Sequence, residues 1–218
     1  MAASTAPLAP KVGAEPTADR IREDIVSGEF APGQRLVEAD LSESYQASRG
    51  AVRNALQQLE HEGLVERIAN RGARVRVVSV EEAVAITEVR MVVEGLVGAK
   101  AAQNATPEDV AELREIGAAM QAAVAGGEIM VYSGLNVRLH DKIRVMGRQD
   151  VAEEVLGRLL ARNVRHQFRL ALRPGRPQVS LPEHLAIIEA VCAGDPAAAE
   201  AAVREHVASV IRALQQTD

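Results

Sequence analysis

Apolar residues recur every three or four positions over most of the chain, a spacing that places them on one face of a helix. Boundary residues divide this pattern into segments. Thr106 precedes Pro107 at one predicted helix start, Ser180 opens a predicted capping box, and "RPGRP" at 173–177 is predicted as a loop. The predicted helices cover residues 81–104, 107–125, 128–146, 149–172, 181–193 and 196–216. We therefore predict an all-helical bundle over residues 80–218.

The N-terminal part of the chain has three shorter helical patterns. Helices are predicted at 17–28 and 37–44, and a third helix follows Ser48, whose hydroxyl is a suitable N-cap. The apolar stripe of the third helix consists of Val52, Ala55, Leu56 and Leu59. Such a stripe predicts that this helix packs on one side and exposes its other side.

Two β-prone segments, 64–68 and 73–78, follow the third helix around "ANRG". Gly72 supplies the positive φ that a tight turn needs, so the segments predict a hairpin. Three helices and a hairpin predict a winged helix-turn-helix domain over residues 17–79. Residues 1–16, rich in Ala, Pro and Thr, are expected to be a disordered leader.

Composition supports a mostly helical fold and narrows the location of the protein. Hydrophobic residues make up 47% of the chain but aromatic residues only 2%, which predicts an aliphatic core. No apolar run approaches the roughly 18 residues of a membrane span, and the N-terminus has no secretory signal pattern. The single cysteine, Cys192, cannot form an intramolecular disulfide, which fits a reducing cytoplasm.

The charge distribution is uneven, although the net charge of −5 would by itself argue against nucleic acid. Residues 44–78 contain six Arg and three Glu, whereas residues 17–43 contain three Arg and seven acidic residues. A local basic surface is sufficient to bind phosphates, because affinity depends on the charges at the contact.

The third helix carries Arg49, Gly50 and Arg53 on the face opposite its apolar stripe. Arginines at the start of a recognition helix can bind guanine or phosphate in the major groove, and Arg71 and Gly72 would lie at the tip of the wing. The alternative is a solvated basic face on an ordinary bundle. The preceding turn and the following hairpin favour binding to double-stranded DNA.

Residues 21–75 resemble the DNA-binding domain of the GntR family of bacterial transcription regulators, through "PGQRL", "SRGAVRNALQQLE", "EGLV" and "NRG". The resemblance implies DNA contacts for the candidate residues Arg49, Gly50, Arg53, Arg71 and Gly72. The chain departs from the family pattern at Ala39, where some members carry Arg, and at Gly50 and Asn54, where Thr and Glu are commoner. These differences bear on the operator sequence.

Three predicted helices of the second domain each carry one histidine on their apolar face: His140, His184 and His206. Asn136 precedes His140 by four residues and shares its face. Each histidine taken alone is more simply a hydrogen-bonded core residue. Three imidazoles on three inward faces indicate a site for Zn²⁺ or another borderline divalent ion.

This domain resembles the FCD effector domain of the FadR-type GntR branch, a helical bundle that usually binds a divalent metal. Its motif of Asp or Asn four residues before His, with two later His, falls on Asn136, His140, His184 and His206. Asn in place of Asp removes a negative charge and implies weaker metal binding. We expect Zn²⁺, with Ni²⁺ or Mn²⁺ as alternatives.

Arg90, Arg162 and His166 interrupt apolar stripes of their predicted helices. A buried arginine needs an anion, which is either an internal carboxylate such as Glu94 or the carboxylate of a ligand. The FCD resemblance implies a small carboxylic acid beside the metal. Arg90, with Arg162 or His166, is then the predicted effector-binding set.

These features predict a homodimeric transcription regulator, a repressor that its carboxylate effector releases from a palindromic operator. The dimer is inferred from the resemblance and from the symmetry of such operators. One alternative is a regulator for which the metal is itself the signal. The other, an enzyme with a metal-activated water, lacks a suitable general base, because Asp141 should point about 100° away from His140 on its helix.

Overall fold

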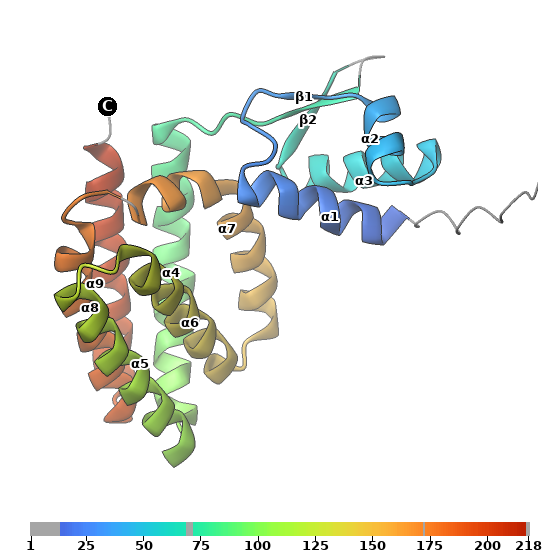
Figure 1. Ribbon diagram of the computed structural model, residues 1–218. Helices are drawn as coiled ribbons and strands as arrows, with labels where there is room; N and C mark the ends of the chain where they lie inside the picture. Colours follow the sequence, from blue (N-terminus) through green and yellow to red (C-terminus); the bar gives the residue numbers. More distant parts are fainter. Residues whose placement is uncertain (1–13, 69–71, 172, 217–218) are drawn as a thin grey trace, which may run out of the picture. The chain divides into compact units, whose positions relative to one another are not determined.

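The computed structural model describes residues 14–68, 72–171 and 173–216 (Figure 1). The chain forms two compact units, Met1–Val77 and Val78–Asp218. The first contains short helices and a small sheet, and the described part of the second is helical. The predicted fold class, a winged helix-turn-helix followed by a helical bundle, is confirmed.

The elements of the first unit follow the order of a winged helix-turn-helix. They are α1 (Ala14–Ser27), β1 (Arg35–Leu36), α2 (Glu38–Ser44), α3 (Arg49–His61), β2 (Val65–Ile68) and β3 (Gly72–Val75). The sheet is antiparallel in the order β1-β3-β2, with Arg35 opposite Arg74 and Val65 opposite Val75. β1 was not predicted from the sequence, because a two-residue strand exists only through its pairing with β3 and leaves no periodic pattern.

Packing against α1 holds α3 in place. The apolar stripe of α3 is buried, including Val52, Leu56 and Leu59, and Ile21 of α1 is fully buried. The Ser48 hydroxyl accepts a hydrogen bond from the Ala51 amide at 3.1 Å, so this residue is the predicted N-cap. The start of α3 is therefore fixed by its cap while its opposite face stays exposed.

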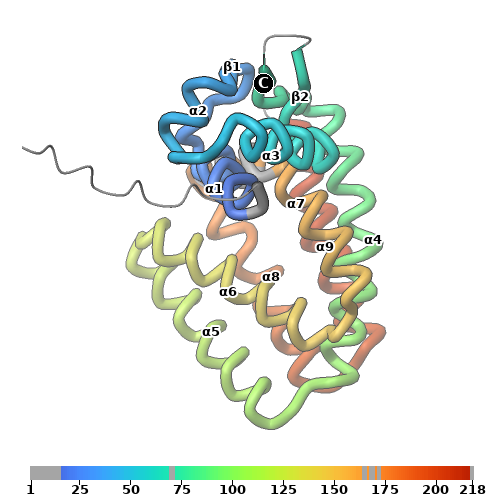
Figure 2. Tube along the Cα trace, turned by 90° about the vertical axis from the view of Figure 1, so that its right-hand side faces the viewer, coloured from blue at the N-terminus to red at the C-terminus, as the bar shows by residue number. Residues whose placement is uncertain are grey.

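The second unit consists of long helices. They are α4 (Val80–Asn104), α5 (Pro107–Ala125), α6 (Ile129–Gly147), α7 (Asp150–Ala171), α8 (Arg176–Cys192) and α9 (Pro196–Gln215). α4 and α9 lie side by side along much of their length (Figures 1 and 2). Gly98 allows this approach, because a Cβ there would lie 2.8 Å from Cγ2 of Val203. No described helix is long and apolar enough to cross a membrane.

The start of α8 differs from the prediction. The helix begins at Arg176, where Gly175 precedes it in the left-handed conformation, and Pro177 lies in its first turn. Ser180 is therefore inside the helix instead of at a cap, and its hydroxyl donates to the Arg176 carbonyl at 3.0 Å. The predicted N-cap at Thr106 is present, and it forms a capping box with Asp109 that the sequence had not indicated.

The interior of the second unit is mostly aliphatic, with several buried polar residues among its helices. Leu113, Leu139 and Ile187 are fully buried members of its hydrophobic core. The buried polar residues of this unit are Thr87, Arg90, Glu94, Asn163, Ser180, His184, His206 and Ser209. Because burying polar groups costs free energy unless they are paired or bind a ligand, the members that lack a partner, such as Nε2 of His184, mark the candidate site.

Candidate functional site

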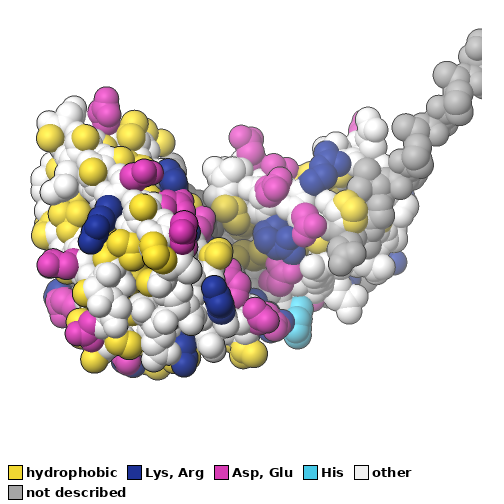
Figure 3. Space-filling view, turned by 90° about the horizontal axis from the view of Figure 1, so that it is seen from below, with side chains coloured by type: hydrophobic (Ala, Val, Ile, Leu, Met, Phe, Trp, Pro, Cys, Tyr) yellow, Lys and Arg dark blue, Asp and Glu magenta, His cyan; other side chains and the backbone are white. Residues whose placement is uncertain are grey.

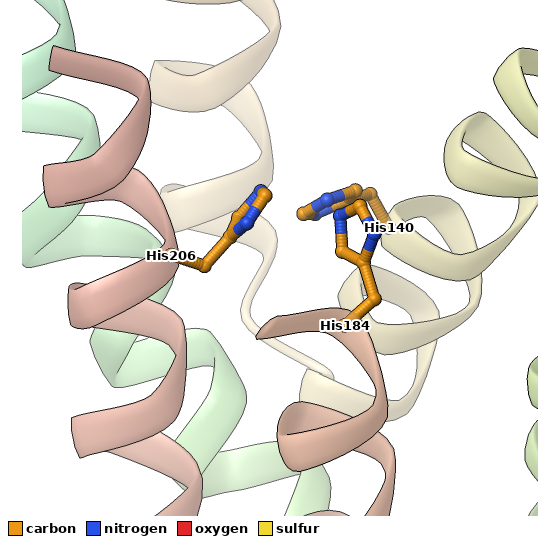
Figure 4. A group of neighbouring side chains, drawn as sticks. All are labelled: His140, His184 and His206. Carbon is orange, nitrogen blue, oxygen red and sulfur yellow. The ribbon is translucent and has the colours of Figure 1, made fainter. Parts of the chain in front are cut away.

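Three helices bring His140, His184 and His206 together inside the second unit (Figure 4). They come from α6, α8 and α9, and one ring nitrogen from each lies within 4.8 Å of the others. The ring centroids are 5.4 Å apart for His140 and His184, and 4.4 Å apart for His184 and His206. Helices distant in the sequence therefore converge on one point.

The three imidazoles are held in their neutral form. Burial lowers the pKa of His140, and it lowers the pKa values of His184 and His206 well below their ordinary range. Neighbouring imidazoles lower the pKa values of the latter two further. Neutral imidazole is the form that binds a metal, so the cluster needs no deprotonation near neutral pH.

Two buried atoms in this region have no hydrogen-bond partner among the described residues: Nε2 of His184 and Oδ1 of Asn136. Unpaired buried polar atoms are rare in folded proteins and call for an explanation. Asn136 lies one turn before His140 on α6, and so on the same face. Three imidazole nitrogens and an amide oxygen fit a borderline divalent cation, and both unpaired atoms would then be ligands.

Arg90 and Glu94, both on α4, form a buried ion pair with 2.7 Å between Nε and Oε1. The internal carboxylate considered from the sequence is therefore present. Nη1 of Arg90 remains buried with no partner in the described part of the chain. After burial, Glu94 and Arg90 are the strongest influences on the pKa of His140, which Glu94 raises and Arg90 lowers. The charges of this ion pair therefore act on the histidine cluster.

The other two predicted effector-binding residues, on α7, contact the start of α4. Arg162 pairs with Glu82 at 2.7 Å, and Nε2 of His166 lies 2.8 Å from the Val78 carbonyl oxygen. These two contacts do not bring either residue to the histidine cluster. Nε of Arg162 is nevertheless buried and lacks a partner among the residues described.

Sequence reasoning missed three residues around the histidines: Tyr132, Arg176 and Glu183. Hydrogen bonds join Tyr132 to His184 and Glu183 to His206. A helical spacing could have indicated Tyr132, which precedes Asn136 by four residues, whereas Arg176 lies in "RPGRP", which the sequence predicts as a loop. Nothing in the sequence pairs Glu183 with a histidine on another helix.

The predicted DNA-contact residues of α3 lie at its start. Arg49 is its first residue and is exposed, as is Arg53, which pairs with Glu38 of α2 at 3.1 Å. A Cβ on Gly50 would meet only Oγ of Ser48, at 3.9 Å, so the fold does not require glycine at this position. α3 therefore exposes Arg49 and Arg53 on either side of Gly50, where no side chain covers the backbone.

Gly72 and Arg71 are the two predicted DNA contacts of the wing. Gly72 has a φ of +88°, and a Cβ there would collide with the Leu36 carbonyl oxygen, so the sheet itself requires this glycine. Arg71 lies outside the described residues. On the face of the molecule shown in Figure 3, acidic and basic side chains are interspersed.

A winged helix-turn-helix followed by a helical unit with an internal histidine cluster defines a two-domain transcription regulator. Residues 14–75 match the bacterial regulatory proteins of the gntR family, and residues 85–209 match the FCD domain. The chain belongs to the GntR family, in the branch that carries an FCD domain.

Known regulators resemble the chain over most of its length. It is 26% identical to the probable D-xylose utilization operon transcriptional repressor of Paenarthrobacter nicotinovorans, over 92% of this chain and 88% of that protein. It is 24% identical to the repressor RspR of Escherichia coli K12, over 90% and 86%. The E. coli McbR/YncC structure has a TM-score of 0.76 at 22% identity, covering 93% of this chain and 97% of that one. The first two of these relatives are transcriptional repressors and not enzymes, which agrees with the function class predicted for this chain.

Proposed function

We propose that the protein is a homodimeric repressor in the cytoplasm whose binding to a palindromic operator is controlled by a small carboxylic acid. In this proposal the acid binds beside a divalent metal in the helical domain. Repression is the activity named for two of the relatives, at about a quarter sequence identity. The observation that carries the proposal is the convergence of three imidazoles, two of them buried and the third half-buried, with an unpaired Nε2 on His184.

The DNA-binding head uses the start of α3. Arg49 and Arg53 approach base edges or phosphates, and Gly50 lets the backbone come close. The positive end of the helix dipole adds affinity for phosphate. Arg71 and Gly72, at the wing, are the remaining proposed contacts. Two heads in a dimer would bind half-sites about one helical turn of DNA apart.

The metal is held by His140, His184, His206 and the Asn136 amide oxygen, and Zn²⁺ is the preferred ion for this donor set. Ni²⁺ competes through the same nitrogen ligands, and Mn²⁺ ranks below both in general affinity. All four ligands are neutral, so the bound ion keeps its full charge. That charge attracts an anion to any coordination position left open.

Arg90 is the proposed anchor for the effector carboxylate, because its Nη1 is a buried donor without a partner among the described residues. Arg162 is a second candidate through its unpaired Nε. His166, already engaged with the Val78 carbonyl oxygen, is the least available of the three. Binding of the acid would favour one arrangement of the two heads over another and so change operator affinity.

Fluorescence anisotropy with an operator duplex tests this proposal. The protein is stripped of metal, reloaded with Zn²⁺ and titrated with DNA in the presence of panels of small mono- and dicarboxylates. Release of DNA by one acid at saturating Zn²⁺, lost in Arg90→Gln, supports the proposal. Release or capture by Zn²⁺ or Ni²⁺ alone instead identifies the metal as the signal. A protein that binds no duplex at low salt contradicts the regulator mechanism.

A further inference from the structure

The Nδ1 atoms of two clustered histidines are already committed to hydrogen bonds. Nδ1 of His206 lies 2.9 Å from Oε2 of Glu183, and Nδ1 of His184 lies 2.9 Å from the Tyr132 hydroxyl. An imidazole that uses one nitrogen in this way can offer only the other, Nε2, to a ligand. The hydrogen-bond partner of each Nδ1 therefore determines which ring nitrogen carries the proton.

The partner of His206 leaves one possibility. An ionised carboxylate only accepts hydrogen bonds, so Nδ1 of His206 must carry the proton and donate it to Glu183. Arg176 lies on the same carboxylate, with Nη2 at 3.4 Å from Oε2, and fixes the carboxylate in place. The lone pair of His206 is consequently on Nε2.

Nδ1 of His184 bonds to the Tyr132 hydroxyl, which in turn bonds to the Ser180 hydroxyl. The direction of donation along these hydrogen bonds is also determined. The Ser180 hydroxyl donates to the Arg176 carbonyl at 3.0 Å, which uses its only proton. Ser180 can then only accept from the Tyr132 hydroxyl at 2.7 Å, and Tyr132 can only accept from Nδ1 of His184. The lone pair of His184 is consequently on Nε2, the atom that is buried without a partner.

We propose that Glu183 and Tyr132 are positioning residues that hold His206 and His184 as their Nδ1–H tautomers and direct both Nε2 atoms at the metal. This inference rests on the metal site of the proposed function. Residues that bind the far nitrogen of a metal-ligating histidine fix its orientation and raise its basicity as a ligand.

Glu183 also supplies a negative charge near the metal, because the four proposed ligands are all neutral. Asn136 would contribute a neutral amide oxygen, so the ligand set itself contains no carboxylate. Glu183 places a carboxylate one imidazole ring away, where the metal's charge strengthens its hydrogen bond from Nδ1–H. Tyr132 is neutral and cannot do this, so Glu183 should have the larger effect on metal affinity.

Three single variants test the proposal: Glu183→Gln, Tyr132→Phe and the matched control Glu189→Gln, which changes an exposed glutamate of the same helix. Nitrogen-15 NMR of the metal-free protein reads the tautomer of each ring. Competition with a chelator measures Zn²⁺ affinity, and Co²⁺ absorption reports the ligand geometry. A purely structural contact between α8 and α9 would change thermal stability without moving the tautomers.

We expect wild-type His184 and His206 to be Nδ1–H. Glu183→Gln should lose that preference at His206 alone and weaken Zn²⁺ binding by about 10- to 100-fold. Tyr132→Phe should lose it at His184 alone, with a smaller loss of affinity, and Glu189→Gln should match the wild type. Adding Asn136→Asp to Glu183→Gln should recover affinity, since it returns a negative charge.

A wild-type His206 protonated on Nε2, or Zn²⁺ affinity in Glu183→Gln within about twofold of the wild type, overturns the inference. Should Glu183→Gln fail to fold, the tautomer of His184 in Tyr132→Phe decides the question. If the wild type binds no metal, the metal site of the proposed function fails. The tautomers of the metal-free protein still test the roles of Glu183 and Tyr132 separately.

Discussion

Replacement of Arg53 by Ala tests the DNA-binding face with little risk to the fold. The Arg53 side chain is 59% exposed, and its ion pair with Glu38 lies at the surface. Such pairs contribute little to stability, since solvent screens them. The change removes no buried contact, so the melting temperature should stay close to that of the wild type.

Operator binding should respond differently. Loss of one arginine contact to a base weakens binding by about 5- to 150-fold, and loss of a phosphate contact also reduces the slope of log affinity against log salt by about one. Arg53 must give up or share Glu38 when it binds DNA, which puts the expected loss toward the lower half of that range. Glu38→Gln should then bind DNA more tightly than the wild type.

A matched control separates a specific contact from a change in net charge. Arg158 on α7 is 57% exposed and pairs with Glu154, much as Arg53 pairs with Glu38. Arg158→Ala therefore removes the same charge from the helical domain. Anisotropy titrations of both variants, between low and physiological salt, measure the difference. Equal affinities for Arg53→Ala and Arg158→Ala would refute the placement of Arg53 on the DNA.

Three other changes test the helical domain. His140→Ala should bind less Zn²⁺ and lose most of the rise in melting temperature that Zn²⁺ gives the wild type, which scanning fluorimetry measures; an unchanged rise would remove His140 from the site. Burial lowers the pKa values of His184 and His206, so below pH 6.5 the unfolded chain binds more protons than the folded one. The free energy of unfolding of the metal-free domain should therefore be at its full value above the unfolded pKa of about 6.5 and should fall as the pH drops below it. Urea unfolding from pH 8 to pH 5 checks that direction, and a flat profile would contradict the burial of neutral rings. Gly98→Ala should destabilise the domain by about 1–3 kcal/mol through overpacking, whereas Gly134→Ala, with nothing within 4 Å of the new Cβ, should be neutral or stabilising in the same unfolding assay.

The order of elements could be predicted where local patterns are strong. The stripe of α3 and the N-caps at Ser48 and Thr106 are all local features, and the structure contains each of them. β1 and the first turns of α8 could not be predicted in the same way. A strand of two residues depends on its partner β3, and "RPGRP" has the composition of a loop although Arg176 and Pro177 begin a helix.

The histidine cluster shows the same division within the site. Helical periodicity placed His140, His184 and His206 on inward faces, and the structure brings them within 4.8 Å of one another. For Arg90 the sequence left an internal or an external anion open, and the structure pairs it with Glu94. Arg162 was assigned to the effector from its apolar stripe, yet its partner is Glu82, 80 residues earlier.

The sequence by itself determined which face of each helix carries the functional side chains. The rotation per residue is fixed in a helix, so the direction of each side chain depends only on its local position. Only the tertiary structure decided which atoms on those faces meet. The proton positions on His184 and His206 depend on Tyr132, 52 residues away, and on Glu183, 23 residues away. A hydrogen bond has a direction and a reach of about 3 Å, so it is set by how helices pack and not by spacing along the chain.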